Sequence, residues 1–269
     1  EGFGYYHFTI RNGRRESTAT SFLAGAINRP NLTILTNAEV SRIIFNGKRA
    51  SAVELIKRGK VETLVALKEI VLCGGAIGSP AILMRSGVGA ASELMALGIK
   101  PVTDRPGVGK NLHDHVLVRV CHEAPTKFTL HGLTRVDRAA VAFLQAWILG
   151  KGPMTVFPLE AGAYLRGPGA DLPNIQSHFL PALSSATVRF NPFKTLSNSG
   201  SGFMANASLM RPASRGRLKL THRDYRAPLD ISVNYLSDPR DVEQLVDAVE
   251  MLREVFSQKP LDDYRGIEI

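Results

Sequence analysis

Cysteine is scarce in this sequence, whose 269 residues include only Cys73 and Cys121. Two isolated thiols in apolar surroundings exclude a disulfide framework and favour reduced cysteines in a cytoplasmic protein. Long apolar runs are also missing, because no segment approaches the roughly 20 apolar residues of a membrane-spanning helix. The first residues lack the basic start and the apolar stretch of a secretory signal peptide. We therefore expect a cytoplasmic protein without an integral membrane segment.

Positive charge is in excess, but dense basic runs are absent. The formal net charge is +9, and the basic residues lie scattered along the chain without an interleaved aromatic platform. Nucleic-acid-binding surfaces normally gather such residues on one face or stripe. The charge pattern therefore argues against a nucleic-acid partner.

The most informative segment covers residues 75–89 and directly follows the apolar run 70–73. Paired glycines after a β-branched run, followed by Ser79 and Pro80, predict a buried strand, a tight turn and a helix start. We expect Ser79 to cap the helix and Pro80 to occupy its first position. Glycines let backbone N–H groups approach a bulky anion such as a diphosphate. A turn that serves packing alone is the alternative.

Two patterns of secondary structure divide the sequence at about residue 116. The first part predicts a hairpin turn at residues 12–13, strands at 31–36, 39–45, 50–57 and 61–67, a buried parallel strand at 69–73 and a helix at 90–97. The second part predicts a helix at 135–149, strands of an antiparallel sheet at 161–165, 174–180, 203–210, 217–221 and 231–235, and a helix from 238 to about 258.

Residues 75–89 resemble the second sequence signature of the glucose–methanol–choline oxidoreductases, with its Ser-Pro pair, its apolar pair and its closing Ser-Gly-Val-Gly. Further blocks are similar to the family in the same order along the chain: residues 12–17, 30–36, 106–115, 160–162, 211–217 and 234–238. The resemblance covers nearly the whole chain. It is strongest toward the choline and alcohol dehydrogenase branch.

The resemblance implies an α+β and α/β architecture: part of an FAD-binding Rossmann-like domain plus an antiparallel-sheet substrate domain with flanking helices. We expect the boundaries 1–115, 116–237 and 238–269, the last being a helix of the substrate domain or an interdomain segment. The family's Gly-x-Gly-x-x-Gly turn and its C-terminal histidine block have no counterpart here. The chain is therefore expected to be an internal piece of a larger enzyme, with no catalytic residue of its own.

The resemblance also assigns roles at the FAD site. The backbone of Val40 matches a position against the adenine, and Gly74 and Gly75 match the turn beside the diphosphate and ribose. Asn111, His113 and Asp114 lie in a loop on the flavin side of the cleft. A packing turn remains the alternative for the glycines. His113 and His115 resemble a metal pair, but without a third ligand we expect no metal site.

The resemblance implies an FAD-dependent alcohol dehydrogenase that transfers a hydride from a small-molecule alcohol such as choline to the flavin and then reduces an electron acceptor. Glu160, in an apolar stretch, is the substrate-side candidate, since a carboxylate in a dry pocket attracts a cationic alcohol. A structural ion pair is its alternative role. A family oxidase, a hydroxynitrile lyase or a non-catalytic fragment are alternative functions, and peripheral association with the inner membrane is an alternative location.

Overall fold

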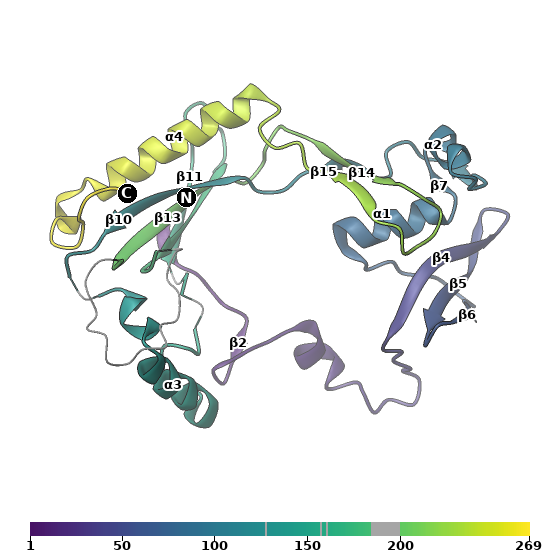
Figure 1. The fold of residues 1–269 in the computed structure, drawn as a ribbon, viewed down its shortest axis with the longest axis horizontal. Coiled ribbons are helices and arrows are strands. Elements are labelled where there is room, and N and C mark those ends of the chain that lie inside the picture. Colours follow the sequence, from purple (N-terminus) through teal and green to yellow (C-terminus); the bar gives the residue numbers. More distant parts are fainter. Residues whose placement is uncertain (127, 157, 160, 184–199) are drawn as a thin grey trace. The chain divides into compact units, whose positions relative to one another are not determined.

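The computed structural model describes residues 1–126, 128–156, 158–159, 161–183 and 200–269. These residues form two compact units (Figure 1). Unit 1 comprises residues 1–32, 115–211 and 239–269, and unit 2 comprises residues 33–114 and 212–238. Helices and mostly antiparallel sheets occur in both, which confirms the α+β class.

Unit 1 is built on a five-stranded antiparallel sheet in the order β1-β11-β12-β13-β10. Its strands are β1 (Gly2–Tyr5), β10 (Leu117–Glu123), β11 (Ala161–Leu165), β12 (Ile175–Leu180) and β13 (Gly202–Leu209). Helix α4 (Pro239–Phe256) packs against β10 and β13 (Figure 1). Because side chains alternate along a strand, one sheet face supplies Ile175, Phe203 and Ala205 to a core completed by Leu252 and Phe256. The predicted helix from residue 238 is confirmed.

The rest of unit 1 consists of short elements. The predicted turn at residues 12–13 joins β2 (Ile10–Arg11) to β3 (Arg14–Arg15), with positive φ at both turn residues. The π-helix η1 (Ala19–Leu23) follows, and the 3₁₀ segments η2 (Leu130–Thr134) and η4 (Lys259–Leu261) occur later in the chain. The helix predicted at residues 135–149 forms as α3 (Val136–Leu144) continued by the π-helix η3 (Gln145–Leu149).

Unit 2 contains a β-meander of β4 (Ala38–Asn46), β5 (Arg49–Lys57) and β6 (Lys60–Val65), as the sequence predicts. Helix α1 (Gly75–Arg85) packs against β4 and β14. The remaining elements are β7 (Val88–Gly89) paired in parallel with β8 (Thr103–Asp104), helix α2 (Ala91–Ala96), and a sheet of β9 (Lys110–Leu112), β14 (Gly216–Leu220) and β15 (Leu229–Ser232). A small core joins Ala81, Met84, Leu94 and Leu218.

Two predicted strands are wrong. Residues 31–36 and 69–73 have no strand structure, and Val71 in the second run is 72% exposed. A strand needs a hydrogen-bonded neighbour, and no described segment pairs with either run. The predicted grouping of later strands is also wrong in part, because β14 and β15 pair with β9 rather than with the five-stranded sheet. Among the described residues, no helix has the length and apolar content to cross a membrane.

Candidate functional site

The glycine turn lies at the start of helix α1. Gly75 has a φ of +72°, a left-handed conformation that favours glycine. The helix begins at Gly75, so the predictions that Ser79 caps it and that Pro80 opens it are wrong: both residues lie inside the helix. From inside the helix, the Ser79 hydroxyl accepts a hydrogen bond from the Gly74 N–H at 3.0 Å.

The two glycines of this turn serve different purposes. A Cβ atom on Gly74 would lie 3.0 Å from the Ser79 nitrogen and 3.1 Å from the Gly78 carbonyl carbon, so Gly74 allows the turn to pack tightly. A Cβ atom on Gly75 would meet no atom within 4 Å. The first three amides of a helix have no acceptor within it, and those of residues 75–77 lie in an exposed segment. These open amides suit an oxygen-rich anion.

Val40 lies on β4, and β5 is the strand that pairs with β4 within the part of the chain that the structure describes. Its register is irregular between Val40 and Arg42. The last turn of α1 holds the strand here, because Arg85 Nε donates to the Ser41 carbonyl at 2.9 Å and the Ile43 N–H donates to Ser86 Oγ at 2.8 Å. The glycine turn opens the same helix, about 15 Å away along an axis that rises about 1.5 Å per residue.

Asn111 lies in β9 and adopts a left-handed backbone with a φ of +60°, which asparagine tolerates better than most residues. The strand is held against β14 because the Leu218 N–H donates to the Gly109 carbonyl at 2.6 Å. Asn111, His113 and Asp114 are all exposed. Asp114 accepts a hydrogen bond from the Tyr235 hydroxyl at 2.9 Å, and this bond raises the Tyr235 pKa.

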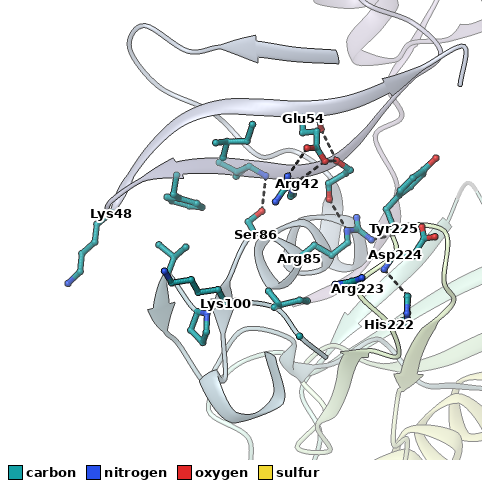
Figure 2. A pocket seen from close by; sticks show the side chains of 18 of the residues that line it. Arg42, Lys48, Glu54, Arg85, Ser86, Lys100, His222, Arg223, Asp224 and Tyr225 are labelled. Carbon is teal, nitrogen blue, oxygen red and sulfur yellow. Dashed lines mark hydrogen bonds and ion pairs between the residues drawn. The ribbon is translucent and has the colours of Figure 1, made fainter. Parts of the chain in front are cut away.

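A cavity of about 1100 Å³ in unit 2 is lined by none of these predicted residues (Figure 2). Arg42 forms a double contact with Glu54 across β4 and β5, at 3.1 and 2.8 Å, and Ser41 Oγ donates to the same carboxylate at 2.7 Å. The hydrogen bond from Arg42 is the main reason that the Glu54 pKa is lowered. Sequence reasoning missed this cluster because its register depends on the irregular pairing beside Val40.

Unit 1 presents a polar patch on the sheet face opposite its core. The Tyr6 hydroxyl donates to the Ser177 carbonyl at 2.7 Å, and its ring lies 5.2 Å from that of His178. Burial raises the Tyr6 pKa and lowers the His178 pKa. Asn206 lies opposite His178 on β13, and its buried Oδ1 has no hydrogen-bond partner among the described residues. This unpaired acceptor marks a place for a further donor.

The substrate-side prediction for Glu160 falls outside the described residues. The polar patch of Tyr6, His178 and Asn206 is a cluster in unit 1 that the sequence did not indicate. Its members come from three separate strands or loops, so only the sheet pairing brings them together.

The turn of α1, the meander and the separate sheet-and-helix unit define the class: an α+β protein with an exposed glycine turn suited to a phosphate-bearing ligand. Two sequence models described as GMC oxidoreductase match residues 1–117 and 212–267, which together make up more than half of the chain. The chain belongs to the GMC oxidoreductase family.

The curated relatives match along this entire chain. It is 40% identical to an oxygen-dependent choline dehydrogenase of Paraburkholderia phytofirmans and 38% identical to one of Chromohalobacter salexigens. All of this chain and 47% of each relative are covered, so the chain spans about half the length of these proteins.

Solved structures share the fold. The pyridoxine 4-oxidase from Mesorbium loti is 29% identical with a TM-score of 0.77, over 97% of this chain and 46% of that one. A formate oxidase is 20% identical with a TM-score of 0.87, over 100% of this chain and 50% of that one, which supports the fold alone.

Proposed function

We propose that this chain is a segment of an FAD-dependent oxidoreductase that oxidises the CH–OH group of a choline-like primary alcohol. The observation that carries the proposal is the 40% identity to oxygen-dependent choline dehydrogenases along the whole chain. FAD, when bound, supplies the acceptor for the hydride that leaves the alcohol carbon. In this proposal, residues 1–115 belong to a partial FAD-binding domain and residues 116–237 to a substrate-binding domain. Residues 238–269 form a helix of the substrate domain or an interdomain segment. The protein is proposed to act in the cytoplasm.

The exposed turn of α1 fits the diphosphate of FAD. Gly75 leaves open space where any other residue would place a Cβ atom, and residues 75–77, whose amides have no acceptor within the helix, are exposed. Gly74 keeps the turn tight through its contact with Ser79. The Val40 backbone holds the adenine side, and Asn111, His113 and Asp114 line the flavin side. These assignments extend the family resemblance to positions of this chain.

The substrate side belongs to unit 1 in this proposal. Glu160 attracts the cationic head of a choline-like alcohol, while the polar patch of Tyr6, His178 and Asn206 positions polar groups beside it. The lowered His178 pKa keeps its imidazole neutral near pH 7, so the ring adds no positive charge that would repel a cation. None of these residues is assigned to the proton transfer.

Flavin fluorescence of the purified chain titrated with FAD tests the cofactor assignment. The same titration is made with a version extended at both ends to the length of the relatives. We expect tight FAD binding and choline-dependent bleaching of the flavin absorbance in the extended protein only. Tight binding by the 269-residue chain would show that it forms the whole cradle itself. No binding by either version would favour a non-catalytic protein.

The glycine turn offers a matched pair of variants in the extended protein. Gly75→Ala forces a side chain into a left-handed position next to the diphosphate, whereas Gly78→Ala adds a methyl group where nothing lies within 4 Å. We expect weaker FAD binding for Gly75→Ala and unchanged binding for Gly78→Ala. Equal FAD affinities of the two variants would show that this turn does not bind the diphosphate.

The similarity to a pyridoxine 4-oxidase favours oxygen as an alternative electron acceptor. Oxygen consumption measured beside reduction of an artificial acceptor separates an oxidase from a dehydrogenase. Cleavage of a hydroxynitrile without any acceptor would indicate a lyase instead.

A further inference from the structure

The cavity of unit 2 in Figure 2 has more positive than negative side chains in its lining. Its walls come from β4, β5, the C-terminal end of α1, the loop at residues 98–102 and the β14–β15 connection, all within unit 2. A recess with low-dielectric walls concentrates the field of such charges and attracts a counter-ion. Two carboxylates, Glu54 and Asp224, face five cationic side chains: Arg42, Lys48, Arg85, Lys100 and Arg223.

The two carboxylates of the cavity already have partners. Glu54 accepts the double contact from Arg42, so these two charges neutralise each other. Asp224 accepts a hydrogen bond from the Arg226 N–H at 3.0 Å. Lys100 and Arg223 form no ion pair within the part of the chain that the structure describes. The cavity therefore keeps positive charge without a counter-ion.

Arg85 is the half-buried cation of this group. Its Nε donates to the Ser41 carbonyl at 2.9 Å, and its Nη1 donates to the Tyr225 carbonyl at 3.5 Å. These neutral acceptors hold the guanidinium in place without neutralising it, and among the described residues Glu39 attracts it only from beyond ion-pair distance. Burial is the main reason that the Arg85 pKa is lowered. An anion beside this guanidinium would offset the cost of its partial burial.

A neutral donor and apolar side chains complete the lining. His222 Nδ1 accepts the Asp224 N–H at 3.0 Å, so the neutral imidazole carries its proton on Nε2 and can donate it. Ile99 and Val102, both half-buried, line the same cavity. Guanidinium groups match the oxygens of a phosphate in a planar fork. The lining therefore suits a phosphate group carried on an organic body.

We propose that the cavity between β4, the end of α1 and the β14–β15 connection binds a phosphate-bearing organic anion. Arg85, Arg223 and Lys100 hold the phosphate, and the organic body lies against Ile99 and Val102. In Figure 2 the Lys48 side chain points away from the other cations, so it takes no part. A monocarboxylate is a poorer occupant, because its single charge leaves most of the surplus without a counter-ion.

This site is separate from the glycine turn. The turn opens α1, whereas the cavity lies at the other end of the same helix, about 15 Å away. The inference therefore goes beyond the proposed flavin chemistry and does not depend on it.

Isothermal titration calorimetry of the purified chain tests the site with phenyl phosphate, inorganic phosphate and phenol. We expect phenyl phosphate to bind more tightly than inorganic phosphate, because its ring contacts the apolar wall. Both affinities should fall at high salt. Phenol, which has the ring without the charge, should give no heat of binding.

Variants that each remove one charge locate the site. Arg223→Gln and Lys100→Gln change exposed side chains of the lining, and each should weaken phenyl phosphate binding about tenfold, the equivalent of about 1.4 kcal/mol. The control Lys60→Gln removes a charge at the exposed start of β6, outside the cavity lining, and should bind like the parent chain. Circular dichroism confirms that each variant folds.

Four outcomes would overturn the proposal. Neither phosphate compound binds. Lys60→Gln weakens binding as much as the two lining variants, which would reduce the effect to attraction by net charge. FAD displaces phenyl phosphate, which would make the cavity part of the cofactor site. Extension of the chain to the relatives' length abolishes phenyl phosphate binding, which would show that the added residues fill the cavity.

Discussion

Unit 1 and unit 2 contain similar kinds of apolar segments, but the two units bury them to different degrees. In unit 1, the five-stranded sheet and α4 form two complete layers around Phe203, Ile175 and Leu252. In unit 2, the buried cluster is limited to a few side chains of α1, α2 and β14, and the apolar runs 31–36 and 69–73 have no strand neighbour among the described residues. The comparison teaches that an apolar pattern becomes buried structure only where the chain also supplies the opposing layer.

Truncation of the unit 1 core should produce the largest effect. Leu252 is 2% exposed on α4, and Leu252→Ala should lower the free energy of unfolding of unit 1 by about 2–5 kcal/mol. Val246→Ala on the same helix removes a side chain that is about half exposed and should change it by no more than about 0.5 kcal/mol. Peptide-resolved hydrogen exchange measures the two units separately. Equal loss of protection in unit 2 would show that the units do not unfold independently.

The link between α1 and β4 should produce the next largest effect. Ser86 Oγ is buried, accepts the Ile43 N–H and donates to the Ile82 carbonyl at 2.5 Å. Ser86→Ala leaves a buried amide without an acceptor, at a cost of about 1–3 kcal/mol to unit 2. The control is Ser79→Ala, whose hydroxyl accepts a bond from the exposed Gly74 N–H. Urea unfolding followed by hydrogen exchange compares the stability of unit 2 in the two variants. Equal losses of stability would show that the buried Ser86 hydrogen bond has no special weight.

Local patterns made much of this architecture predictable. The meander β4-β5-β6 and the hairpin at residues 12–13 join neighbouring segments through turns with positive φ, so their partners are adjacent in the sequence. Helix α4 buries Leu245, Ala248, Leu252 and Phe256 at helical spacing, as its apolar pattern predicts, although Asp241 is buried with them and Val242 is exposed. The strand predictions for residues 31–36 and 69–73 were wrong because strand propensity says nothing about whether a neighbouring strand is present.

The candidate site was predictable where glycine limits the backbone and unpredictable where long-range pairing decides. The positive φ of Gly75 follows from the paired glycines. The contact of Arg42 with Glu54 depends on an irregular register between β4 and β5. Asn206, whose Oδ1 has no partner among the described residues, joins the polar patch only because β13 pairs with β12.

Two substitutions in the glycine turn of unit 2 should change its stability by smaller amounts and in opposite directions. Gly75→Ala should destabilise unit 2 by about 1 kcal/mol, because alanine adopts a left-handed φ at that cost. Gly78→Ala, in a helical conformation with open space around it, should stabilise by about 0.5–1 kcal/mol. Denaturant midpoints of the two variants give the comparison. A destabilising Gly78→Ala would show that a close contact also constrains this part of α1.

The smallest predicted effect is a difference in how the stabilities of the two units respond to acid. Burial lowers the His178 pKa in unit 1, so the unfolded state binds more protons than the folded state as the pH falls through the ordinary histidine value of about 6.5. Unit 1 should therefore lose stability in that window. In unit 2, Arg42 lowers the Glu54 pKa, and this contribution is lost only further down, as the pH falls from the ordinary value near 4.5 through the folded one. Between pH 7.5 and 5.5, hydrogen exchange should show the loss in unit 1, and His178→Gln should flatten that pH dependence. An equally steep dependence in the variant would mean that another group of unit 1 binds the proton.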